Sequence, residues 1–313
     1  MIKLAIVLPC FNEEEVLEGS ALKIKSVLEE LVSKLKISPD SFALFVNDGS
    51  HDSTWSIICS LHERDSQFKG LNLAHNVGHQ YAILAGMMVA KDLSDAVVTI
   101  DVDLQDDTSA IEKMVDEYAL GNDVVYGVKV SRDADPFMKR FTASAFYKLQ
   151  SVMGAEIINN HADFRLMSRR ALEFLSYYQE RNVYLRGLVP MLGLKSSIVD
   201  DVISERKTGK SKYTLSKMIN LAIDGITSFS IRPIMMIVPL GLIFVIISMI
   251  IMIHVLYSYI VGNVVPGWSS LMISVWFVGG MCLMAMGIIG LYIGRIYTEV
   301  KHRPLYIIQD KLV

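Results

Sequence analysis

Cysteine is scarce in this sequence, with three residues, Cys10, Cys59 and Cys282, spread over 313 positions. Their odd number and wide spacing match neither a disulfide framework nor a metal-ligand pattern, which fits a reducing compartment. An excess of positive charge is also missing, since 30 Lys and Arg residues face 33 Asp and Glu residues, for a net charge of −3. Because nucleic-acid binding needs a basic surface, this balance argues against a nucleic acid as the partner.

The N-terminus lacks the features of a secretory leader. The apolar run at residues 2–9 is too short for the apolar core of a signal peptide, and the polar residues 12–15 follow it at once. We therefore expect the polar part of the chain, up to about residue 230, to stay in the cytoplasm.

Asp, Glu, Lys and Arg are absent from two long segments, residues 234–256 and 271–293. The whole chain is 52% hydrophobic, with a mean hydropathy of +0.38. A membrane span needs roughly 20 apolar residues. The alternative, a buried core helix, seldom stays apolar on all sides for so long. The sequence thus predicts two transmembrane helices within residues 233–295, joined by a short external loop at residues 257–270.

Charge distribution predicts the orientation of these helices. The loop at residues 257–270 has no Lys or Arg, whereas basic residues precede the first span and follow the second. The positive-inside rule places both termini, and with them the polar N-terminal domain, in the cytoplasm, as expected of a multi-pass protein of the inner (plasma) membrane. Small residues in the second span favour close helix packing and a homo-oligomer; they are Gly279, Gly280, Gly287, Gly290 and Gly294.

Strand and helix patterns alternate in the first 130 residues. Short β-rich runs are followed by helical spacing of apolar residues, and Asn12 with Glu15 predicts a capping box for the first helix. Such alternation predicts an α/β domain with a Rossmann-like, mainly parallel sheet, whose ligands bind beyond the carboxyl ends of the strands. The expected strands are residues 4–8, 42–46, 71–73, 96–100 and 123–127.

Asp101 and Asp103 stand directly after an expected buried strand. Two carboxylates on alternate residues can jointly hold a hard cation such as Mg²⁺ or Mn²⁺, which would bridge a diphosphate. An isolated Asp-x-Asp is more often a solvated strand end. Here Gln105 and Asp106 extend the polar run, and Asp48 closes a neighbouring strand, so we favour the metal site.

Asp48 lies in Asn47-Asp48-Gly49-Ser50, a sequence that favours a turn. The same carboxylate would also stand at the crevice of the sheet, where it could bond a base or a ribose. These two interpretations are compatible.

Five motifs in one order resemble a known enzyme family. Residues 8–14 (LPCFNEE), 46–50 (VNDGS) and 101–106 (DVDLQD) resemble family 2 glycosyltransferases with the GT-A fold. Residues 160–166 (NHADFRL) and 206–213 (RKTGKSKY) resemble the dolichyl- and bactoprenyl-phosphate branch, including bactoprenol glucosyltransferases with two C-terminal transmembrane helices. The similarity covers nearly the whole chain.

The resemblance implies roles on the donor side of the reaction. Asn47 stands where relatives usually have Asp, which puts the part of that position in base recognition in doubt. The implied nucleotide contacts are Pro9, Asn12, Glu14, Asp48 and Asp101, and the implied metal ligands are Asp101, Asp103 and Gln105.

Arg140 and Ser144 are four residues apart, on one face of an expected helix. From the residues alone, a clamp for a lipid phosphate and an ordinary amphipathic helix are equally good interpretations. The resemblance favours the clamp and gives Arg140 a catalytic role. Further basic residues expected near the lipid phosphate are Lys129, Arg132, Arg206 and Lys212, the last two of which could also be topology signals.

Asp163 and Arg165 form a polar patch in apolar surroundings. They could form only a structural ion pair, whereas the resemblance places Asp163 near the sugar, as a base or a hydroxyl ligand.

Taken together, the resemblance implies inverting transfer of a hexose, glucose from UDP-glucose first, to undecaprenyl or dolichyl phosphate. A processive polysaccharide synthase is less favoured, because residues 179–182 do not match its Gln-x-x-Arg-Trp motif and two helices make a poor channel. A non-catalytic membrane adaptor is a third hypothesis. The expected organisation is a GT-A domain at 1–205, an amphipathic juxtamembrane segment at 206–232, two spans within 233–295, and a cytoplasmic tail at 296–313.

Overall fold

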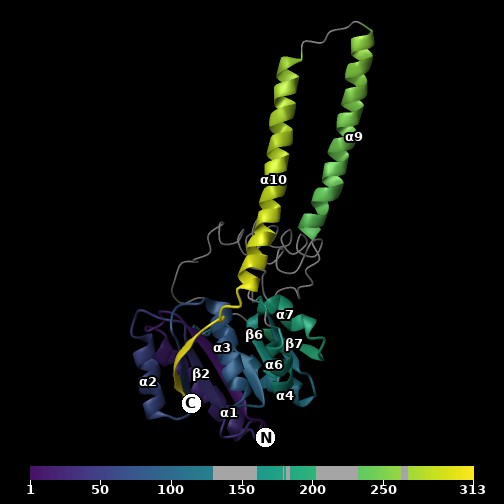
Figure 1. The fold of residues 1–313 in the computed structure, drawn as a ribbon. Helices are drawn as coiled ribbons and strands as arrows, with labels where there is room; N and C mark the ends of the chain where they lie inside the picture. Colours follow the sequence, from purple (N-terminus) through teal and green to yellow (C-terminus); the bar gives the residue numbers. More distant parts are fainter. Residues whose placement is uncertain (130–160, 179, 181–183, 202–231, 262–266) are drawn as a thin grey trace. The chain divides into compact units, whose positions relative to one another are not determined.

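The computed structural model describes residues 1–129, 161–178, 180, 184–201, 232–261 and 267–313. They belong to two compact units. The first contains the described residues up to 201 together with residues 303–313, and the second contains the two long C-terminal helices (Figure 1).

An eight-stranded sheet forms the centre of the first unit, in the order β7-β5-β6-β4-β1-β2-β3-β8. The five strands expected from sequence are all present, and three more, β6, β7 and β8, were not anticipated. The strands are β1 (Leu4–Cys10), β2 (Phe42–Asn47), β3 (Phe68–Leu73), β4 (Ala96–Thr99), β5 (Val124–Lys129), β6 (His161–Ser168), β7 (Ser196–Asp201) and β8 (Ile308–Leu312).

The middle of the sheet is parallel, as predicted, but the sheet as a whole is mixed. Strands β4, β1, β2 and β3 run parallel to one another, and β5 runs parallel to β7. Strand β6 is antiparallel to both β4 and β5, and β8 is antiparallel to β3. The parallel core nevertheless brings the ends of β1, β2 and β4 to one edge, where ligands of α/β sheets bind.

Helices cover both faces of the sheet. Along β1 the side chains alternate, so that Leu4, Ile6 and Leu8 join the core cluster formed with α1, while Val7 faces α3. Strand β1 is buried throughout, which matches its unbroken apolar sequence. The helices of this unit in the described residues are α1 (Leu17–Ser33), α2 (Thr54–Arg64), α3 (His79–Lys91), α4 (Ala110–Ala119), α6 (Arg169–Ser176) and α7 (Leu185–Met191).

The predicted capping box is wrong. Helix α1 begins at Leu17, and Val16 before it makes no side-chain cap. Asn12 lies five residues upstream in the left-handed region, with a φ of 54°. Its carboxamide is used elsewhere, because Oδ1 accepts the backbone N–H of His51 at 2.9 Å.

Helix α3 packs unusually close to the sheet at Gly86. A Cβ atom at this position would lie 2.4 Å from Cγ1 of Val7 and 2.7 Å from Cγ2 of Val46. The absence of a side chain therefore allows the helix to rest on β1 and β2. Helix α3 begins at His79, which lies beside the carboxyl ends of these strands.

The expected C-terminal tail contributes a strand to the sheet of the first unit. Residues Ile308–Leu312 form β8, which pairs antiparallel with β3 in the register Gly70↔Leu312 and Asn72↔Asp310. Local sequence patterns could not predict this pairing, because residues 70 and 312 come together only in the folded chain. In Figure 1 this strand is the yellow segment at the edge of the sheet.

The second unit contains α9 (Arg232–Ile260) and α10 (Trp268–Val300). The two helices are in contact through the aromatic rings of Phe244 and Phe277, whose centroids are 5.5 Å apart. Among the described residues one segment, Phe277–Val300, is long and apolar enough to cross a membrane, with a mean hydropathy of 1.9, and Pro239–Ile251 is a shorter apolar stretch. The prediction of two spans is thus met in part.

Candidate functional site

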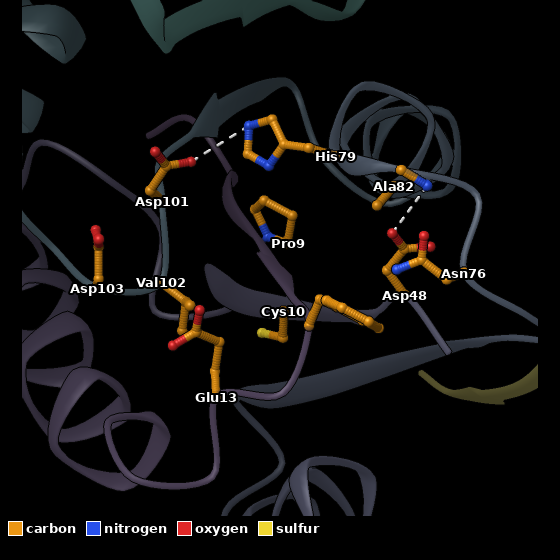
Figure 2. A pocket seen from close by; sticks show the side chains of 12 residues that line it. Pro9, Cys10, Glu13, Asp48, Asn76, His79, Ala82, Asp101, Val102 and Asp103 are labelled. Carbon is orange, nitrogen blue, oxygen red and sulfur yellow. Dashed lines mark hydrogen bonds and ion pairs between the residues drawn. The ribbon is translucent and has the colours of Figure 1, made fainter. Parts of the chain in front are cut away.

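A cavity of about 380 Å³ opens at the carboxyl edge of the parallel strands. Figure 2 shows its wall, with Asp101 facing His79 on one side and Asp48 on the other. The lining residues come from the end of β1, the loops after β1, β2 and β4, the loop before α3 and α3 itself; they are Pro9, Cys10, Phe11, Glu13, Asp48, Asn76, Gly78, His79, Ala82, Asp101, Val102 and Asp103.

Hydrogen bonds that involve side chains connect the loop after β1 to the loop after β2. The backbone N–H of Asn12 donates to Oγ of Ser50 at 3.0 Å. The carboxylate of Glu14 accepts the backbone N–H of Ser53, also at 3.0 Å. Two of the expected nucleotide contacts, Asn12 and Glu14, therefore hold the loop after β2, while a third, Pro9, lines the cavity itself.

Asp48 has the turn role that its sequence indicates, and it also lines the cavity. Its two carboxylate oxygens accept the backbone N–H groups of Val77 and Gly78, at 2.7 and 3.0 Å. Gly49 has a φ of 62°, and a Cβ there would lie 2.5 Å from the backbone nitrogen of Asn76. Only glycine fits this close crossing of the two loops, which fixes Asp48 against the segment leading into α3.

Asp101 and Asp103 both line the cavity, as predicted. Desolvation by the surrounding protein raises the pKa of Asp101 to about 6; His79 opposes this effect, and the nearby carboxylates of Asp163, Asp106 and Asp103 add to it. Such mutual repulsion of carboxylates is what a bound cation relieves.

The two aspartates fit a divalent cation as a partial ligand set. Within the described residues no group of three His, Cys, Asp or Glu side chains is arranged to hold a metal. A Mg²⁺ site commonly uses one or two carboxylates and takes its other ligands from phosphates and water, so two aspartates suffice. Gln105 lies beside them, with its side-chain amide donating to the carboxylate of Asp103.

Asp163 is the most heavily bonded carboxylate near the cavity. Arg165 donates to Oδ1 at 2.8 Å, and Gln80 and Arg186 donate to Oδ2 at 3.0 and 3.2 Å. Burial raises the pKa of Asp163, but the hydrogen bond from His79 and the charges of Arg186 and Arg165 more than offset this, so the pKa lies well below its usual value. The expected ion pair with Arg165 is present, and a carboxylate held in this way is a weak base.

His79 links the two acidic groups. Its Nε2 lies 3.5 Å from a carboxylate oxygen of Asp101 and 3.5 Å from one of Asp163. Burial lowers the pKa of His79, whereas the hydrogen bond to Asp163 and the charges of Asp101 and Asp163 raise it above the usual value. This shift favours the protonated form of the imidazole, which is paired with both carboxylates.

Sequence reasoning missed His79, Gln80 and Arg186. His79 could have been found, because it follows Gly78 at the start of a helix on the predicted ligand-binding edge. Arg186 has no such signal, since only the packing of α7 against β6 brings it to Asp163.

Most residues of the expected acceptor site lie outside the described part of the chain. Lys129 is the last residue of β5 and pairs in register with Asp201 of β7. The roles of the remaining residues stay predictions; they are Arg132, Arg140, Ser144, Arg206 and Lys212.

Comparison with known proteins shows which protein family this chain resembles. The family described as glycosyl transferase family 2 matches residues 5–175. The chain is 48% identical over 309 residues to the uncharacterized glycosyltransferase YkoT of Bacillus subtilis (strain 168), covering 99% of this chain and 92% of that protein. It is 38% identical over 312 residues to the bactoprenol glucosyl transferase of Shigella phage SfV, covering 99% of both proteins.

Among solved structures, the mannosyltransferase PcManGT from Pyrobaculum calidifontis, in complex with GDP-Man and Mn²⁺, is 18% identical to this chain. The match covers 66% of this chain and 58% of that one, with a TM-score of 0.42. The family match spans more than half of the sequence and includes the cavity-lining residues of β1, β2, α3 and β4. The chain therefore belongs to glycosyl transferase family 2, and it is a glycosyltransferase.

Proposed function

We propose that this enzyme, with the GT-A variant of the α/β fold, transfers a hexose from a nucleotide sugar to polyprenyl phosphate. UDP-glucose is the first candidate donor, and undecaprenyl or dolichyl phosphate is the acceptor. The observation that carries the proposal is the similarity to the phage bactoprenol glucosyl transferase, which extends over 99% of both chains and so includes the two apolar helices.

The reaction is a direct displacement at the anomeric carbon. An oxygen of the lipid phosphate forms the new bond to this carbon as the bond to the nucleoside diphosphate breaks, and the electron pair leaves with the diphosphate. An α-linked donor would give a β-linked product. Because the attacking phosphate is already anionic, no strong base is required, which agrees with the low pKa of Asp163.

Asp101 and Asp103 are proposed to hold Mg²⁺ or Mn²⁺. When bound, the cation supplies positive charge that stabilises the departing diphosphate. His79 and Arg186 fix Asp163, which orients the sugar through its carboxylate rather than removing a proton. Asp48 and the hydrogen-bonded loops that contain Asn12 and Glu14 form the part of the crevice that binds the nucleotide.

Membrane anchoring by two spans is supported by the sheet itself. Strands β7 and β8 belong to the same sheet, so the chain must return to its starting side between residues 201 and 308. The number of crossings in between is therefore even. If α10 crosses the membrane, a second segment crosses too, and α9, with exposed apolar side chains such as Ile250 and Ile253, is the candidate. The catalytic domain and both termini would then be cytoplasmic.

The decisive experiment is transfer of radiolabel from a panel of nucleotide sugars into an organic-extractable lipid. Membranes containing the full chain would be supplied with undecaprenyl phosphate and Mg²⁺ or Mn²⁺. We expect labelled lipid from one donor, and loss of this product with a chelator or in Asp103→Ala. Asp92→Ala, an exposed aspartate outside the cavity, is the matched control and should keep full activity.

Two results would contradict the proposal. Label that appears in a long polymer rather than in a single lipid would favour a processive synthase. Nucleotide binding without any product from any donor would favour a non-catalytic adaptor.

A further inference from the structure

Three side chains form a hydrogen-bonded relay across the edge of the sheet. Nδ2 of Asn47 donates to Oδ1 of Asn72 at 2.7 Å, and Nδ2 of Asn72 donates to Oδ2 of Asp310 at 2.9 Å. Asn47 and Asn72 are 2% and 8% exposed. Because a buried amide without partners is costly, the relay satisfies groups that would otherwise destabilise this edge.

The relay begins beside the cavity. Asn47 is the last residue of β2 and immediately precedes Asp48, which lines the cavity. Its Oδ1 accepts the backbone N–H of Ser50 at 3.3 Å, and Oγ of Ser50 accepts the backbone N–H of Asn12. Asn47 therefore contacts the loop that connects the two sides of the expected nucleotide site.

The relay ends on the C-terminal strand, which is held firmly in the sheet. A methyl group of Leu312 packs against Gly70, and the backbone N–H of Ala74 donates to the carbonyl of Ile307 at 2.9 Å. Asp310 lies directly opposite Asn72 in the register of β3 and β8. Its carboxylate is thus presented to Asn72 by the strand pairing.

We infer that the Asp310–Asn72–Asn47 relay makes β8 a positioning element of the nucleotide site, so that donor binding depends on the last residues of the chain. This inference rests on the proposed function, since it concerns the same crevice. These three residues touch no reacting atom; they act through the loop at Ser50 and through Asp48.

The direction of the relay yields a sharp test. Asp310 can only accept, which orients Asn72 with its amide nitrogen toward Asp310 and its oxygen toward Asn47. In Asn47→Asp, two acceptors face each other. Asn72 can turn over to donate to the new carboxylate, but its oxygen then faces the carboxylate of Asp310. Asp310→Asn supplies the missing donor, so the double variant restores both bonds in the reverse direction.

The experiment measures the affinity of the full-length protein in detergent for UDP with Mn²⁺, by calorimetry. We expect Asn47→Asp to weaken binding about tenfold, as loss of one buried hydrogen bond predicts. Asp310→Asn alone keeps an acceptor for Asn72 and should stay within about twofold of the wild type. The double variant should recover to within about threefold. Lys311→Gln, the neighbouring charge on β8, should leave the affinity unchanged.

Hydrogen exchange at the amides of residues 50–54 provides a readout that needs no ligand. Exchange should be faster in Asn47→Asp and return to the wild-type rate in the double variant. If Asp310→Asn fails to rescue Asn47→Asp in either measurement while the wild type binds UDP, the relay inference is overturned and the proposed function stands. If the wild type binds neither UDP nor GDP, both are overturned.

Discussion

At the scale of single residues, Asp101 and Asp163 are two carboxylates in contact with one histidine, and their pKa values shift in opposite directions. Asp163 is held ionised by Arg165, Arg186 and His79, whereas burial raises the pKa of Asp101 to about 6. His79 lies between the two. This arrangement places cationic groups around Asp163 and leaves Asp101 facing the cavity, in line with its proposed role as a metal ligand.

Substitution of His79 tests whether this link matters for the reaction. We expect His79→Ala to lower kcat by at least about tenfold, because Asp101 and Asp163 lose the group that orients them. His79→Gln keeps a hydrogen-bond donor and should recover part of the rate. The measurement is lipid-product formation at saturating donor, with KM determined in parallel.

His75→Ala is the matched control, because His75 is exposed and lies four residues upstream, outside the cavity lining. A change in KM alone, with kcat preserved, would show that His79 only assists donor binding. Equal activity of His79→Ala and the wild type would refute the positioning role.

At the scale of elements, the close packing of α3 on the sheet fixes the position of His79 and Gln80. This contact depends on Gly86, where a Cβ atom would overlap the side chains of Val7 and Val46. Strand β8 acts similarly at the edge of the sheet, where it fixes Asn72. The helix contact at Gly86 and the pairing of β8 with β3 both join segments that are distant in sequence.

Gly86→Ala should destabilise the catalytic domain by about 1–3 kcal/mol, the usual cost of overpacking a core. Gly19→Ala is the matched control, because Gly19 is in the helix α1 and a Cβ there meets nothing within 4 Å. It should stabilise the domain by about 0.5–1 kcal/mol through the lower entropy of the unfolded chain. Chemical denaturation of the two variants measures both changes, and equal effects would contradict the packing argument.

At the scale of the whole molecule, the shared sheet of β7 and β8 constrains membrane topology more strongly than hydropathy does. Within the part of the chain that the structure describes, hydropathy identifies one segment, Phe277–Val300, whereas strand pairing requires an even number of crossings. Any membrane-spanning arrangement must therefore place the eight strands of the sheet, β8 included, on one side.

Thiol labelling with a membrane-impermeant reagent tests this arrangement. Asp40→Cys, Asn263→Cys and Gln309→Cys would be compared in intact cells and in inverted vesicles, with the parent protein as the control for its native cysteines. We expect Asn263→Cys to react only from outside, and the other two only from the cytoplasmic side. Labelling of Asp40→Cys and Asn263→Cys from the same side would contradict two spans.

Much of the cavity wall could be predicted from the sequence. Five strands, the ligand-binding edge and the carboxylates Asp48, Asp101 and Asp103 follow from local apolar patterns and from short motifs. The prediction was wrong about the capping box at Asn12, because the carboxamide bonds to the loop after β2 instead. It was also too simple in describing residues 296–313 as a tail.

The sequence by itself determined the parallel core, the carboxylates at its edge and the apolar character of the two C-terminal segments. Each of these depends on residues that are close together in the chain. Only the tertiary structure decided that His79 and Arg186 meet Asp163, that Gly86 seats α3, and that Asp310 completes a relay to Asn47. The most widely separated of these partners, Asn72 and Asp310, are 238 positions apart in the sequence. The physical reason is that strand pairing and helix packing, rather than local spacing, bring these residues together.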